Sequence, residues 1–156
     1  MSNRLYLFVD VDGVLHEGCP VDESRHYSKM PPFAEWLRRW LDVHIVISST
    51  WRETRALEQL QQHYPADLRH RVVGVTPILR RQSSIVGRVP GEREIEIRAW
   101  IHTFESTTTR WAAVDDDASG FTKGLHELVL TDTSAGLTQG ALEAIERVLG
   151  LQAADL

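Results

Sequence analysis

Short apolar runs alternate along this chain with longer segments in which apolar residues recur every three or four positions. Apolar runs bounded by polar or turn-forming residues are typical of buried strands, whereas the longer spacing is typical of amphipathic helices. The runs predict strands at residues 5–9, 43–47, 71–75, 111–114 and 128–130. The helical spacing predicts helices at residues 32–41, 52–64, 92–104 and 142–149.

The alternation of predicted strands and helices indicates the fold class. Strands that are apolar on both faces and separated by helices favour a parallel sheet with helices on each side. Two stretches are rich in glycine, proline and polar residues: residues 13–31 are predicted to form turns with a loop or a short hairpin, and residues 76–91 a loop. Since the sequence shows no repeat and no low-complexity linker, we expect one α/β domain over residues 1–156. The expected architecture is a three-layer α/β/α Rossmann-like sandwich around a parallel sheet of about five strands.

Composition and charge are those of an ordinary globular protein. Apolar residues make up 42% of the chain and charged residues 25%, and no apolar run is long enough to span a membrane. The first apolar run is cut off by two aspartates, and the one cysteine, Cys19, has no partner for an internal disulfide, so we expect a cytoplasmic protein. The net charge of −5 does not indicate nucleic-acid binding. The sequence does not predict an oligomeric state.

Polar side chains follow four of the predicted strands at the point where each strand ends. They are Asp10 and Asp12, then Ser48 and Ser49, then Asp115, Asp116 and Asp117, and finally Asp132. Ligands of open parallel sheets bind at the carboxyl ends of the strands. The sequence therefore predicts that polar groups far apart in the chain gather at one edge of the sheet.

Asp10 and Asp12 form the strongest local signal for chemistry. Two carboxylates just past a buried strand are costly unless something positive binds them. A turn at Gly13 would aim both side chains and a backbone carbonyl at one point, and Mg²⁺ is the hard cation that suits few carboxylates plus water and phosphate oxygens. The alternative is a solvated turn with two surface aspartates.

The motifs around these residues resemble those of the haloacid dehalogenase-like (HAD) superfamily. Asp10-Val11-Asp12-Gly13-Val14 resembles the first motif of its phosphatases, Val46-Ile47-Ser48 the second, and Val114-Asp115-Asp116 the fourth. Segments 47–52 and 96–101 are similar to the small uncapped HAD domain of Swiss-army-knife RNA repair proteins. The lysine of the third motif is missing, and Arg93, which opens the predicted helix before the fourth strand, is the best substitute.

This resemblance implies a Mg²⁺-dependent phosphoric monoester hydrolase with an aspartyl-phosphate intermediate. Asp10 would be the nucleophile and Asp12 the general acid and base. The metal ligands would be Asp10, the Asp12 carbonyl and Asp116, with Asp115 as a further acidic candidate. Phosphate would be held by Ser48, or alternatively Ser49, together with Arg93.

The gaps between the predicted elements are too short for an inserted cap domain, which leaves the expected site open. An open site favours a large phosphorylated substrate, such as a polynucleotide end or a phosphoprotein, or loose selection among small phosphates. The RNA-repair resemblance favours a nucleotide or polynucleotide, whereas the acidic charge argues against tight nucleic-acid binding.

Two other functions stay open at this point. Because the third-motif lysine is missing, the domain could be a catalytically weak module that binds phosphate or a partner protein. A dehalogenase proper is disfavoured, since Asp12 suits phosphoryl transfer.

Other conspicuous residues are given structural interpretations. Asp117 is expected in a solvated turn, and Asp132 is expected to cap a turn, with the rim of the site as the alternative. His16 is expected in a loop without a metal-binding partner. Trp51 is expected in packing, although it follows the second motif and could instead line the site. Four tryptophans are expected in the core: Trp36, Trp40, Trp100 and Trp111.

Overall fold

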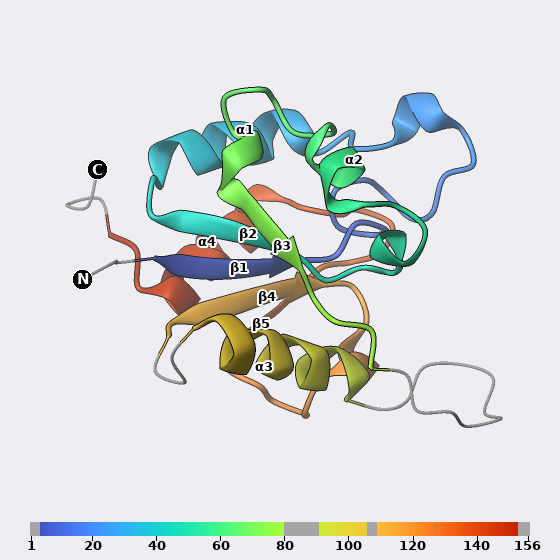
Figure 1. Ribbon diagram of the computed structural model, residues 1–156. Coiled ribbons are helices and arrows are strands. Elements are labelled where there is room, and N and C mark those ends of the chain that lie inside the picture. Colours follow the sequence, from blue (N-terminus) through green and yellow to red (C-terminus); the bar gives the residue numbers. More distant parts are fainter. Residues whose placement is uncertain (1–3, 80–90, 106–108, 153–156) are drawn as a thin grey trace, which may run out of the picture.

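A computed structural model describes residues 4–79, 91–105 and 109–152 of the chain. Its centre is a sheet of five parallel strands in the order β3-β2-β1-β4-β5, and the strand arrows in Figure 1 point to the same side. The strands are β1 (Leu5–Val9), β2 (Val43–Ile47), β3 (Val72–Val75), β4 (Trp111–Asp115) and β5 (Leu128–Leu130). The predicted parallel sheet is therefore confirmed.

Helices cover both faces of the sheet. The α-helices are α1 (Met30–Arg39), α2 (Leu57–Gln61), α3 (Glu92–Phe104) and α4 (Gln139–Leu149). The described residues also form 3₁₀ turns, which are η1 (Glu23–Arg25), η2 (Thr50–Glu53), η3 (Arg69–Arg71) and η4 (Ala118–Gly120). None of the helices in the described part of the chain has the length and apolarity that a membrane span needs.

Strand β1 explains why the sheet has two cores. Successive side chains of a strand point to opposite faces, so an unbroken apolar run serves both. Leu7 and Val9 belong to a cluster with residues of α1, α2 and α4, whereas Tyr6 and Phe8 pack with residues of α3. This arrangement confirms the three-layer α/β/α architecture, and the described residues contain no cap domain.

Most predicted elements are confirmed, and the predicted helix over 52–64 is wrong. In its place, η2 and the short helix α2 are separated by residues 54–56. The Ser49 side chain accepts the Trp51 N–H and starts the tighter turn, while the Gln59 side chain accepts the Ala56 N–H and starts α2 separately. Helix α4 begins earlier than predicted because the Thr138 hydroxyl accepts the Ala141 N–H. Of the predicted loop at 76–91, residues 80–90 lie outside the described residues.

The strand register brings the ends of three strands level. Val9 of β1 lies opposite both Ile47 of β2 and Val114 of β4. The Ser48 N–H donates to the Val9 carbonyl at 2.9 Å, and the Asp10 N–H donates to the Val114 carbonyl at 3.1 Å. The residues that follow these strand positions therefore start from one row at the carboxyl edge of the sheet.

Candidate active site

Three carboxylates converge at this edge, as the strand register requires. Ligand oxygens of Asp10, Asp115 and Asp116 all lie within 4.8 Å of one another. Asp10 and Asp115 are buried at 3% and 1% exposure, so they repel each other with little screening by water. Burial, together with the nearby charges of Asp10 and Asp116, raises the pKa of Asp115 well above its ordinary value.

Gly13 lets the chain approach this cluster closely. Its φ of +73° lies in the left-handed region, and a Cβ at this position would stand 2.1 Å from the Asp116 Oδ2. The Thr131 hydroxyl donates to the Gly13 carbonyl at 2.7 Å and fixes the turn from the other side. Glycine in the Asp-x-Asp-Gly segment thus brings the turn after β1 against the turn after β4.

The charges of this cluster suit a divalent cation. Asp10, Asp115 and Asp116 carry three negative charges when ionised. The positive charge that faces Asp115 comes from Arg93, which leaves a net charge of −2 within this group. Three carboxylate oxygens are also the donor type that hard cations prefer. The residues present therefore fit a divalent metal ion.

Two buried polar atoms near the carboxylates have no hydrogen-bond partner in the described part of the chain. Among the described residues, Ser48 Oγ and Arg93 Nε are buried and have no hydrogen-bond partner, a state that few native polar groups adopt. Ser49 Oγ differs, because it accepts the Trp51 N–H at 3.2 Å. Of the two serines proposed for phosphate, Ser48 is thus the one whose hydroxyl makes no hydrogen bond among the described residues.

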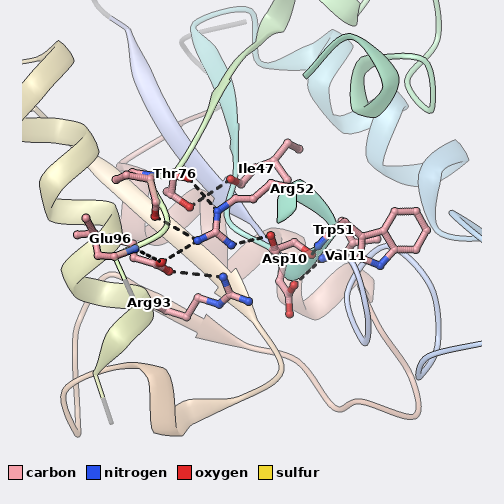
Figure 2. A network of polar contacts seen from close by, with 11 residues as sticks. Asp10, Val11, Ile47, Trp51, Arg52, Thr76, Arg93 and Glu96 are labelled. Atoms are coloured by element: carbon pink, nitrogen blue, oxygen red, sulfur yellow. Dashed lines mark hydrogen bonds and ion pairs between the residues drawn. The ribbon is translucent and has the colours of Figure 1, made fainter. Parts of the chain in front are cut away.

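Arg93 lies at the start of α3, but it is buried instead of solvated. Figure 2 shows Glu96 between the guanidinium groups of Arg93 and Arg52. Arg52 Nη2 donates to Glu96 Oε2 at 2.7 Å, and Arg93 Nη1 lies 3.6 Å from Glu96 Oε1. Arg93 also needs Gly120 opposite it, because a Cβ there would stand 2.8 Å from the Arg93 Cγ. These contacts hold the Arg93 side chain on the site side of α3.

Arg52 connects the backbone segments around the site, and its guanidinium nitrogens are taken up by these connections. Its guanidinium donates to the carbonyls of Ser49 and Thr76 at 2.7 and 2.8 Å, as well as to Glu96. These bonds join the turn after β2, the end of β3 and helix α3 (Figure 2). A guanidinium so fully bonded is a structural element, whereas Arg93 keeps one buried nitrogen, Nε, without a hydrogen-bond partner among the residues that the structure describes.

Asp12 is held by two side chains that the sequence placed first in a loop and in packing, His16 and Trp51. His16 Nε2 lies 2.7 Å from Asp12 Oδ1, and Trp51 Nε1–H donates to the same oxygen at 3.2 Å. His16 Nδ1 accepts the Tyr27 N–H, so the neutral ring carries its proton on Nε2 and donates it to Asp12. His16 is fully buried at 0% exposure.

The sequence carried a weak signal for His16. It stands four residues after Asp12, beyond a glycine that turns the chain back, and Asp12 and His16 form an isolated β-bridge. The position of Trp51 after the second motif allowed it to line the site, but its contact with Asp12 joins segments 39 positions apart and has no local signal.

The remaining predicted residues take the structural roles expected of them. The Asp117 side chain accepts the Ser119 N–H and caps η4, and the Asp132 side chain accepts the Ser134 N–H in the turn after β5. Cys19 is exposed, and the charge of Asp12 raises the pKa of its thiol, which disfavours a nucleophilic thiolate. All four tryptophans predicted for the core are buried: Trp36, Trp40, Trp100 and Trp111.

Comparison with known proteins agrees with this geometry. A family model described as the HAD domain in Swiss Army Knife RNA repair proteins matches residues 6–142. No curated protein matches the chain. The matched segment runs from β1 through every residue of the site to the start of α4. The chain therefore belongs to the family of HAD domains found in Swiss Army Knife RNA repair proteins.

Proposed function

We propose that this protein is a Mg²⁺-dependent phosphatase that hydrolyses phosphoric monoesters through an aspartyl-phosphate on Asp10. The observation that carries the proposal is the meeting of three carboxylates with two unpartnered buried donors, Ser48 Oγ and Arg93 Nε, at one strand edge. A cation and a phosphate group together would satisfy both sets. Membership in the HAD family supports phosphatase-type chemistry.

The residues that would hold the metal are Asp10, the backbone carbonyl of Asp12, Asp115 and Asp116. When bound, Mg²⁺ would supply positive charge that screens the repulsion between the Asp10 carboxylate and the substrate phosphate. Ser48 and Arg93 would bind non-bridging phosphate oxygens as charge develops on them. The Val11 N–H donates to Asp10 Oδ1 at 2.8 Å and fixes the direction of the nucleophilic side chain.

Two proton transfers by Asp12 complete the reaction. An oxygen of Asp10 attacks phosphorus, the bond from phosphorus to the leaving oxygen breaks, and Asp12 gives its proton to that oxygen. Water then attacks the aspartyl-phosphate, Asp12 takes a proton from it, and phosphate leaves Asp10. His16 and Trp51 both donate to Asp12 Oδ1, so Oδ2 is the oxygen that carries the moving proton.

The substrate we propose is the phosphate of a nucleotide or of a polynucleotide end. The absence of a cap in the described residues leaves room for a large leaving group. The family's description names RNA repair proteins, which supports the same class. The net charge of −5 makes tight binding of a long polyanion unfavourable, so recognition would be confined to the region near the phosphate.

Metal dependence tests the proposed function. Protein freed of metal with a chelator should hydrolyse p-nitrophenyl phosphate at the background rate, and Mg²⁺ should restore turnover in a saturable way. Asp116→Asn should raise the Mg²⁺ concentration for half-maximal activity by about tenfold or more, because even indirect partners of metal ligands change affinity that much. Asp117→Asn is the matched control and should leave it unchanged, since Asp117 caps η4. No turnover of any phosphate ester, with or without Mg²⁺, would favour a binding module instead.

Replacing His16 should impair the general acid selectively. His16→Leu removes one of the two donors to Asp12, so kcat for an alkyl phosphate should fall by about 10- to 100-fold, within the range of acid–base catalysis. The kcat for p-nitrophenyl phosphate should fall less, because nitrophenolate leaves without a proton. His16→Gln, whose amide keeps a donor, should recover part of the loss. An equal fall for both substrates would mean that His16 only supports the fold.

A further inference from the structure

A cavity of about 310 Å³ lies beside the candidate active site, and most of its lining side chains end in planar groups. Its lining residues are Glu23, His26, Trp51, Arg55 and His63. Rings and guanidinium groups are the side chains on which aromatic ligands stack. None of the steps proposed above uses this cavity, although Trp51 belongs to both it and the site.

Buried rings hold the walls of this cavity in place. His63 stacks on Tyr27 with ring centroids 4.1 Å apart and an angle of 8° between the planes. His26 stacks on the buried His16 at 5.3 Å, and its Nε2 lies 2.8 Å from the Pro20 carbonyl. A site that is already ordered loses little entropy when a ligand binds.

Trp51 connects the cavity with the general acid. Its indole N–H donates to Asp12, yet Asp12 does not line the cavity. A group in the cavity therefore stands away from the leaving oxygen by roughly the breadth of the indole. A ring joined to the phosphate through a sugar has such a spacing, whereas the ring of a phosphotyrosine is bonded directly to the leaving oxygen.

The charges around the cavity favour an uncharged ring over a second phosphate. The Arg55 guanidinium lies over the Trp51 ring at 3.9 Å from its centroid, where it forms a stacked pair. Burial, with the charge of Arg55, lowers the pKa of His63, which favours the neutral form of its ring. The Glu23 carboxylate also lines the cavity and provides a negatively charged hydrogen-bond acceptor. The Arg55 donor, the Glu23 acceptor and the flat imidazole rings match the edges and faces of a heterocycle.

We propose that this cavity binds the nucleobase of the substrate, next to the phosphate that the site hydrolyses. The inference rests on the proposed phosphatase function and adds the part of the substrate that determines selectivity. His63 and Arg55 bind the base by stacking, which tolerates different bases because each has a flat face, while Trp51 supports the Arg55 guanidinium from below. Trp51 then serves two purposes, since it also keeps Asp12 beside the leaving oxygen.

Paired substrates with and without a base test this inference. Wild-type kcat/KM should be about tenfold or more higher for adenosine 5′- or 3′-monophosphate than for the matching ribose phosphate. His63→Ala should remove most of this preference by lowering kcat/KM for the nucleotide, and His63→Phe should keep it because the flat ring remains. His70→Ala is the control, since His70 lies on η3 at the amino end of β3, away from the site.

Two kinetic results would overturn the inference. One is equal kcat/KM for nucleotide and ribose phosphate in the wild type, with no change in His63→Ala. The other is a phosphotyrosine peptide that is preferred to nucleotides and loses that preference in His63→Ala. If no ester is hydrolysed, the proposed function fails, and binding is then tested with adenosine alone. Adenosine should shift the ring proton resonances of His26 and His63 in NMR spectra but not those of His70, and the lack of any shift would reject the base site.

Discussion

Asp10→Asn should abolish Mg²⁺-dependent turnover, with a loss of roughly 10⁴-fold or more, as for other enzymes that lose their nucleophile. An amide oxygen cannot form the aspartyl-phosphate, and it also offers the metal no negative charge. The measurement is hydrolysis of p-nitrophenyl phosphate, because nitrophenolate leaves without a proton from Asp12 and formation of the aspartyl-phosphate then depends mainly on Asp10. The control is Asp67→Asn, because Asp67 is exposed and pairs with Arg38 at the surface.

Although Asp10→Asn should abolish turnover, it should make the metal-free protein more stable. Asp10 is one of the charges that raise the pKa of Asp115, so a neutral side chain there relieves repulsion in the metal-free protein. Metal-free Asp10→Asn should therefore melt at a higher temperature than metal-free wild type, while Mg²⁺ should stabilise the wild type more than the variant.

Mass spectrometry of acid-quenched wild type should find phosphate on the peptide that contains Asp10. A variant that retains turnover within tenfold of wild type would refute the nucleophile assignment.

The sequence predicted those parts of the site that local patterns determine. The apolar run 5–9 predicts a doubly buried strand, so the position of Asp10 at its carboxyl end follows from the parallel sheet alone. The spacing over 92–104 predicts α3, and thus the position of Arg93 near its start. Ser48 and Asp115 follow the neighbouring strands in the same way, and the register brings both beside Asp10.

Contacts between distant segments could not be predicted in this way. The helix expected at 52–64 fails because Arg52 bonds to carbonyls of Ser49 and Thr76, so the segment follows the ends of β2 and β3. The environment of Asp12 depends on Trp51, which side-chain spacing alone assigns to packing. The preference for Ser48 over Ser49 also needed the hydrogen bond from the Trp51 N–H. Local pattern determined the elements, and tertiary contacts determined which polar atoms remained for a ligand.

Arg93→Ala should lower kcat/KM by about 10²- to 10³-fold, the loss expected when one donor to the developing phosphate charge is removed. Arg93 Nε is buried without a partner, and no other described residue of the site offers an unpaired guanidinium nitrogen. Arg93→Lys should retain activity, because a lysine at this helix position still places a positive charge beside the phosphate. Arg98→Ala is the matched control, since Arg98 lies on the same helix but is exposed and pairs with Glu94.

Inhibition by inorganic phosphate separates phosphate binding by Arg93 from a purely structural effect. If Arg93 contacts phosphate, its removal should weaken inhibition by phosphate along with the fall in kcat/KM, and Arg93→Lys should restore both. If Arg93 only offsets the charge of Asp115, its loss should change the Mg²⁺ requirement and leave phosphate inhibition as it is. Equal rates for the wild type, Arg93→Ala and Arg93→Lys would remove Arg93 from the site. In that case Ser48 and the metal would have to bind the phosphate without a cationic side chain, since the guanidinium of Arg52 is already bonded to carbonyls and to Glu96.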